Sequence, residues 1–136
     1  MMVRSRKAGS FRGLIGERSG GAATEAALVL PALLLLLLSV METGRFLWTQ
    51  NALSFAVEEA ARCASIRATA CPTDAATSIF AAERALGLNV PASVFTVDRP
   101  LCGLRVSASL DFKPAAGAIV NYAIRLEASS CQPMES

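Results

Sequence analysis

The stretch that decides the fold is residues 26–41, AALVLPALLLLLLSVM, which carries no charge and contains eight leucines. On an insertion scale those leucines alone contribute about −4 kcal/mol toward the membrane. Sixteen residues are few for a span, which takes about 20, so we extend the predicted helix back to Gly21. At the helical rise the segment then covers roughly 31 Å, and we predict a transmembrane helix over residues 21–41.

The residues before the apolar run are basic and predict its orientation. This segment contains one acidic residue, Glu17, and five cations: Arg4, Arg6, Lys7, Arg12 and Arg18. Because positive flanks stay on the cytoplasmic side, we place the N-terminus inside the cell. Residues 1–20 are therefore predicted to form a cytoplasmic leader, and residues 42–136 an extracytoplasmic domain.

A cleaved secretory signal is the competing interpretation of the apolar run. Such a signal needs small residues at positions −3 and −1 of a cleavage site just after the run. The sequence instead continues Glu42-Thr43-Gly44-Arg45, with no A-x-A-like triplet. We therefore favour a retained helix, in which Pro31 is acceptable because membrane helices tolerate proline.

The composition argues against several classes of function. Histidine is absent, which removes Ser-His-Asp and Cys-His catalysis and also the commonest metal ligand. The formal net charge of +2 gives no indication of a nucleic-acid partner. Since no motif combines a nucleophile, a base and an orienting group, we predict a non-enzyme without a metal or cofactor.

One carboxylate lies inside the predicted span. Glu25 ends the sequence Gly21-Ala22-Ala23-Thr24-Glu25 and directly precedes the apolar run. A charge at the middle of a membrane costs roughly 2.5–3.5 kcal/mol on insertion scales, and less near the edge. From the residues alone, Glu25 either reaches the headgroup boundary or has a function within the membrane, and both interpretations stay open.

The region around Glu25 resembles the N-terminus of type IV prepilins, and more specifically the TadE-like family of tight-adherence pseudopilins. After a basic leader come the run A-A-x-E-x-A-L-V-x-P, an acidic-x-Gly-Arg motif at residues 42–45 and E-x-A-R at residues 59–62. The resemblance covers roughly residues 18–66. It implies a pilin-like α+β fold and a non-catalytic minor pilin or pseudopilin in the assembly of a Tad-type (type IVb, Flp) adhesive pilus.

The same resemblance implies a processing site. A prepilin peptidase would cut after a glycine, and related pilins carry the glutamate as the fifth residue of the mature chain. That places the cut after Gly20, so that Gly21 becomes residue one and Glu25 residue five. Because Gly20 and Gly21 are adjacent, the cut could follow either glycine. The sequence also departs from the family at Ala26, where the family usually has Phe or Tyr.

Glu25 is then expected to act in assembly. Cleavage creates an α-amino cation, with which the carboxylate of a neighbouring subunit can pair in a medium of low dielectric constant. The implied partners are a prepilin peptidase, other pilins and pseudopilins, and an inner-membrane assembly platform. The implied location is the bacterial inner membrane, with the C-terminal domain in the periplasm. A permanently anchored extracytoplasmic binding module of the cell envelope is the alternative function.

The helix is predicted to continue past the membrane as far as Ala70, just before Pro72. Its apolar positions recur at steps of three and four residues, at Phe46, Leu53, Val57, Ala60, Ala61 and Ala64. Trp48 is either an interfacial anchor or a packing residue. The order of Glu58 and Arg62, four residues apart, favours an ion pair.

A second helix is predicted over residues 75–86, where Thr73 or Asp74 can cap its start and Gly87 ends it. Ile79, Ala82 and Leu86 fall on one face of this helix, which we expect to pack against the rest of the domain.

The period then changes to two, which predicts strands over residues 94–97, 104–112 and 120–128. The last two are joined through residues 113–117 as a hairpin. Apolar pairing predicts Phe112 opposite Val120, Leu110 opposite Tyr122 and, on the outer face, Arg105 opposite Glu127. The domain is thus predicted to hold a second helix and a three-stranded antiparallel sheet with one face on the long helix.

Four cysteines, Cys63, Cys71, Cys102 and Cys131, form no C-x-x-C pair, which argues against zinc-ribbon and thioredoxin-like sites. In an oxidising compartment they suggest two disulfides, and of three connectivities we favour Cys63–Cys71 with Cys102–Cys131. The predicted register sets Cys102 opposite Ser130, so a bulge at Gly103 would be needed to bring the second pair together. Four free thiols are the remaining alternative.

Overall fold

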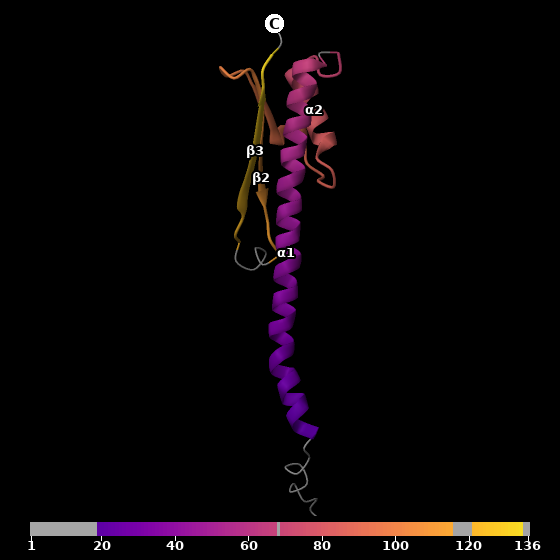
Figure 1. The fold of residues 1–136 in the computed structure, drawn as a ribbon, viewed down its shortest axis with the longest axis vertical. Helices are drawn as coiled ribbons and strands as arrows, with labels where there is room; N and C mark the ends of the chain where they lie inside the picture. The colour runs from indigo at the N-terminus through magenta and orange to yellow at the C-terminus, as the bar shows by residue number, and fades with distance from the viewer. Residues whose placement is uncertain (1–18, 68, 116–120, 135–136) are drawn as a thin grey trace, which may run out of the picture. The chain divides into compact units, whose positions relative to one another are not determined.

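A computed structural model of the chain describes residues 19–67, 69–115 and 121–134. Residues 1–18 of the predicted leader, which include all of its charged residues, lie outside the described residues. The chain divides into two compact units, residues 1–39 and residues 40–136, which we describe separately. The elements in chain order (Figure 1) are α1 (Ser19–Ile66), α2 (Asp74–Arg84), the short 3-10 helix η2 (Ala92–Val94), β1 (Phe95–Asp98), β2 (Leu104–Phe112) and β3 (Ile124–Gln132). The predicted α+β fold, with a long apolar N-terminal helix, a second helix and a three-stranded antiparallel sheet, is confirmed.

In the first unit, the described residues belong to the N-terminal part of α1. The side chains of residues 20–39 are exposed, and the leucines of the apolar run are between 49% and 80% exposed. Pro31 lies inside the helix without ending it. Among the described residues, α1 is the one helix whose length and composition suit a membrane span. An apolar surface of this kind avoids water, which suggests a membrane anchor near the N-terminus.

In the second unit, α1 contributes a stripe of small and apolar residues to the core. Leu53, Val57, Ala60 and Ala61 are fully buried there, while Phe46 and Ala64 pack against them in part-buried positions. These are the six residues of the predicted apolar stripe. Figure 1 shows β2 and β3 alongside this stretch of α1. The alanines leave room for the sheet to approach the helix closely.

The second part of α1 ends earlier than predicted, at Ile66 instead of Ala70. Cys63 and Cys71 are joined by a disulfide with a Cα–Cα distance of 5.9 Å. Eight more residues of helix would separate these Cα atoms by about 12 Å, so the chain must turn back before Cys71. Near this end, Arg62 pairs with Glu59 at 3.9 Å. The predicted partner was Glu58, the preceding residue.

Helix α2 begins with the predicted cap but buries a different face. The Thr73 hydroxyl accepts a hydrogen bond from the backbone N–H of Ala76 at 3.1 Å. The buried residues are Thr77 and Ala81 of α2 and Ala85, which directly follows the helix. The prediction that Ile79, Ala82 and Leu86 form the packed face is wrong, because Ile79 and Leu86 are exposed and Ala82 is only part-buried.

The small residues of α2 explain which of its faces is buried. Residues at intervals of four share one face of a helix, and Ala81 and Ala85 permit close packing there. The third residue on this face, Thr77, is polar, but its hydroxyl donates to the backbone carbonyl of Thr73 at 3.0 Å. Because that hydrogen bond satisfies the hydroxyl, burying Thr77 costs little.

The sheet has the order β1-β2-β3, and both neighbouring pairs are antiparallel. Phe112 lies opposite Ile124 and Leu110 opposite Leu126. The predicted register, with Phe112 opposite Val120, is therefore wrong by four residues on β3, and Val120 itself lies outside the described residues. A shift by an even number keeps every side chain on its predicted face, so the apolar alternation could not reveal the error.

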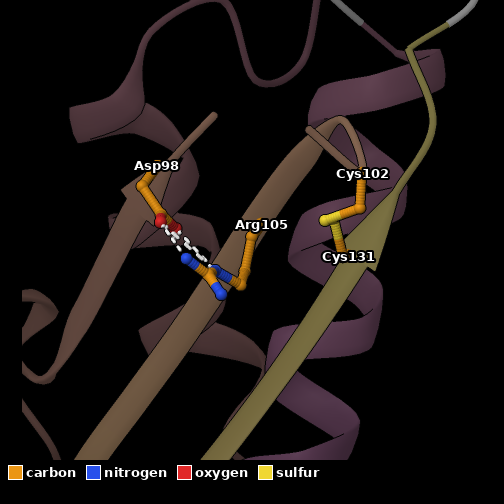
Figure 2. The surroundings of a disulfide bond; sticks show 4 residues. All are labelled: Asp98, Cys102, Arg105 and Cys131. Carbon is orange, nitrogen blue, oxygen red and sulfur yellow. Dashed lines mark hydrogen bonds and ion pairs between the residues drawn. A yellow bond between two sulfur atoms is a disulfide. The ribbon is translucent and has the colours of Figure 1, made fainter. Parts of the chain in front are cut away.

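The new register also changes the ion pairs on the outer face of the sheet. Arg105 lies opposite Asp98 of β1, and its Nη2 atom is 2.6 Å from Asp98 Oδ2 (Figure 2). The predicted pairing of Arg105 with Glu127 is wrong. Arg125 of β3 instead pairs with Asp111 of β2, with 3.3 Å between Nε and Oδ1.

Candidate functional site

The predicted processing site lies at the start of α1. Gly20 and Gly21 are exposed, and a Cβ atom built on either glycine would meet no other atom within 4 Å. Glycine in a helix costs up to about 1 kcal/mol relative to alanine. Because packing among the described residues does not require these glycines, their presence in a helix suggests a requirement imposed by another molecule.

The bond between Gly20 and Gly21 lies in the first turn of α1, which begins at Ser19. The first backbone N–H groups of a helix have no intrahelical partner. Unwinding this turn therefore breaks few hydrogen bonds. Just after the bond, the Thr24 hydroxyl donates to the Gly21 carbonyl at 2.8 Å.

Glu25 is exposed, and within the described residues it has neither an ion pair nor a hydrogen-bond partner for its carboxylate. It stands one turn after Gly21, directly before the apolar run. A carboxylate in the membrane without a partner is costly. The described part of the chain offers no neutralising cation, so a partner would have to come from elsewhere.

Two disulfides join the cysteines in the pairing that the sequence favours. Cys63–Cys71 is buried beside the C-terminal end of α1, whereas Cys102 of the second disulfide is exposed. Figure 2 shows Cys102–Cys131 beside the Asp98–Arg105 pair at the start of β2. Its Cα atoms are 6.3 Å apart.

A glycine turn brings Cys102 to Cys131, not the predicted bulge. The pairing of β2 with β3 runs without interruption from Leu104 to Phe112. Before it, Gly103 adopts a φ of 120° and its N–H donates to the Pro100 carbonyl at 3.0 Å. A Cβ atom on Gly103 would collide with the backbone oxygen of Gln132, so only glycine fits here.

A cluster of contacts around Glu42 was not predicted from the sequence. Glu42 Oε1 accepts a hydrogen bond from the backbone N–H of Ala115 at 3.1 Å. On the next turn of α1, the ring of Phe46 packs edge-on against Phe112 with 5.6 Å between centroids. The guanidinium of Arg45 lies 5.3 Å from the centre of the same Phe112 ring. The acidic-x-Gly-Arg motif was a signal for this cluster, but a motif alone does not identify its distant partners.

The outer face of the sheet carries a shallow, open hollow lined by hydroxyl-bearing and small apolar residues. Thr96, Ser107 and Ser129 lie side by side on the three strands, with Glu127 beside them. No described residues form a group of three or more acidic or cysteine side chains suited to a metal ion. The hollow therefore offers hydrogen-bonding groups to a polar ligand.

The domain and the apolar helix define the class: an α+β protein with two disulfides, whose N-terminal helix suggests a membrane anchor. A family model described as TadE-like protein matches residues 20–62. The match contains Gly20, Gly21, Glu25 and both downstream motifs, so the predicted resemblance to the TadE-like family is confirmed over this segment. That family suggests involvement in the Tad pilus system and is not known as enzymatic. Searches of curated proteins and of solved structures find no match to the chain.

Proposed function

We propose that the chain is a minor pilin or pseudopilin that takes part in the assembly of a Tad-type adhesive pilus. The observation that carries the proposal is the combination of the TadE-like match with an exposed Gly20-Gly21 pair and a Glu25 that has no partner among the described residues. Packing among the described residues explains none of Gly20, Gly21 and Glu25. Cleavage after Gly20 and assembly through Glu25 account for all of them.

The proposed location is the inner membrane. Residues 1–20 form a cytoplasmic leader, residues 21–41 the span and residues 42–136 a periplasmic domain. An oxidising periplasm agrees with two disulfides in the domain. The proposed partners are a prepilin peptidase, neighbouring pilins and pseudopilins, and the assembly platform of the inner membrane.

The role of Glu25 is tested by changing its charge. Glu25→Leu removes the carboxylate and favours membrane insertion by up to about 3 kcal/mol, so the variant should reside in the membrane. It should nevertheless fail to support pilus formation, because the α-amino cation of the neighbouring subunit loses its partner. Pilus formation is measured by electron microscopy and by the amount of sheared surface fibre.

Two further variants separate charge from size. Glu25→Asp keeps the carboxylate and should restore part of the assembly, whereas Glu25→Gln keeps the size and should not. Normal pilus formation by Glu25→Leu would contradict the assembly role and leave Glu25 as a residue of the headgroup boundary.

A permanently anchored binding module of the envelope is the second candidate. The hollow on the outer face of the sheet favours it, because that surface can bind a polar partner without any cleavage of the chain. Such a protein would keep its leader and would work normally with Gly20 replaced by a large residue.

A further inference from the structure

Within the second unit, contacts hold the end of β2 beside Glu42 and the following turn of α1. Glu42, which accepts the hydrogen bond from Ala115, directly follows Met41, the last residue of the run. Along a helix, successive residues advance by about 1.5 Å. The headgroup layer on each side of a bilayer is about 5–8 Å thick. If the span ends at Met41, Glu42 lies within this layer.

Two aromatic contacts fix the same end of the hairpin. Phe112, the last residue of β2, is buried and touches both Phe46 and Arg45 of α1. Because these residues and Glu42 occupy neighbouring turns, the C-terminal end of β2 cannot leave α1 without breaking three contacts. Lys113 and Ala115 therefore stay beside the first turns of α1 after the apolar run.

The charges at this end leave one cation without an acidic partner. Glu42 pairs with Arg45 at 3.5 Å, and Arg125 pairs with Asp111. Lys113 is exposed and has no ion pair within the described part of the chain. Tyr122, just before β3, lies at the same end of the hairpin and is 60% exposed.

We propose that Lys113 and Tyr122 form a second membrane contact, in which the lysine binds the phosphate groups of anionic phospholipids and the tyrosine ring enters the headgroup layer. Aromatic rings with a polar tip favour this layer, and a lysine near an anionic surface is attracted to it. The contact restrains the domain against the bilayer in which α1 is anchored. It depends on the predicted span and not on the pilus role, so it applies equally to a permanently anchored module.

Photocrosslinking from position 122 tests the position of the tyrosine. The full-length chain with Tyr122 replaced by p-benzoylphenylalanine is reconstituted in phosphatidylcholine vesicles containing phosphatidylglycerol, then irradiated and analysed by mass spectrometry. The matched control carries the same group at Leu101, an exposed residue before the opposite end of β2. We expect lipid adducts at position 122 and few at position 101. Equal yields at both positions, or chain-to-chain adducts at position 122 in place of lipid adducts, would overturn the proposal.

The charge of Lys113 is tested in the same vesicles. Lys113→Gln should lower the yield of phosphatidylglycerol adducts at position 122 by about fivefold, the effect of one lysine at an anionic surface. The yield in pure phosphatidylcholine should not change. Arg67→Gln is the control, because it removes one exposed cation beyond the far end of α1, roughly 37 Å from Glu42 at the helical rise. The proposal is wrong if both variants lower the yield equally or if neither does.

Discussion

At the scale of single residues, the glycines separate into two groups. Gly87 and Gly103 have positive φ values of 77° and 120°, and a Cβ atom on either would lie closer than ordinary contact to its surroundings. Gly20, Gly21 and Gly44 lie in α1 in open space. The domain fold therefore requires the first group and not the second. This contrast supports an external reason for Gly20 and Gly21.

We predict that Gly103→Ala destabilises the domain by at least about 2 kcal/mol, because the backbone is strained for alanine and the Cβ atom meets the Gln132 backbone. A loss of this size lowers Tm by roughly 10 °C in a domain of this length. Thermal unfolding of the full-length chain in detergent, followed by near-UV circular dichroism, measures the shift. Gly44→Ala is the control and should be neutral or stabilise by up to about 1 kcal/mol. Equal Tm values for the two variants would contradict this account of the turn.

The role of a residue is easier to predict when its partners lie close to it in the sequence. Glu25 and the glycine pair stand out from the sequence because a charge or a flexible residue is unusual in an apolar helix. The Thr73 cap was also predictable, because its hydrogen bond is local. The contact of Glu42 with Ala115 joins residues 73 positions apart. Only the folded sheet brings them together, and periodicity contains no information about it.

At the scale of elements, α1 was predicted from composition and β3 was misplaced. A long apolar helix needs only its own residues to be recognised. The register of two strands also depends on the length of the connection between them. Because the alternation of β3 has a period of two, pairings four residues apart leave every side chain on the same face, although the observed register sets Leu104 and Val106 opposite polar residues. The face of each strand was therefore predictable and its partner residues were not.

The two disulfides should differ in their reactivity toward reductants. Cys63 and Cys71 are buried, at 2% and 5% exposure, whereas Cys102 is exposed. We expect dithiothreitol to reduce Cys102–Cys131 first in the folded protein. Timed alkylation followed by peptide mass spectrometry measures the order. Reduction of Cys63–Cys71 before Cys102–Cys131 would contradict the structure.

At the scale of the whole molecule, exposed ion pairs give stability a dependence on pH. The hydrogen bond from Arg105 lowers the pKa of Asp98, and that from Arg99 lowers the pKa of Asp74, in each case against a smaller effect of desolvation. A carboxylate whose pKa is lowered in the folded state stabilises the fold at pH values above its pKa in the unfolded state, which is near 3.8. This contribution to stability is lost as the pH falls through the pKa of the folded state.

We therefore expect stability to fall below about pH 4, and Asp98→Asn to reduce this dependence. The effect should be small and should weaken in salt, since both pairs are exposed. Unfolding in urea at a series of pH values measures it. Glu58→Gln is the control, because within the described residues Glu58 has no ion-pair partner. If Asp98→Asn and Glu58→Gln change the loss of stability below pH 4 equally, the Asp98–Arg105 pair does not contribute to that loss.

If the chain is a pseudopilin, a peptidase separates the leader from the anchored domain. Gly20 should be needed for this step because a small residue lets the backbone enter a narrow active site. Gly20→Val should leave a full-length precursor in the membrane. Gly44→Val changes a glycine in equally open space and should be processed normally. Processing of Gly20→Val at the wild-type rate would argue against the predicted cleavage site.

The mass of the native N-terminus tests the central claim most directly. Protein isolated from membranes is digested, and its N-terminal peptide is identified by mass spectrometry. The account predicts a chain that begins at Gly21, or at Ala22 if the cut follows the second glycine. A native chain that begins at Met1 or Met2, with no cut near Gly20 or Gly21, would contradict the pseudopilin role and leave the permanently anchored binding module as the better account.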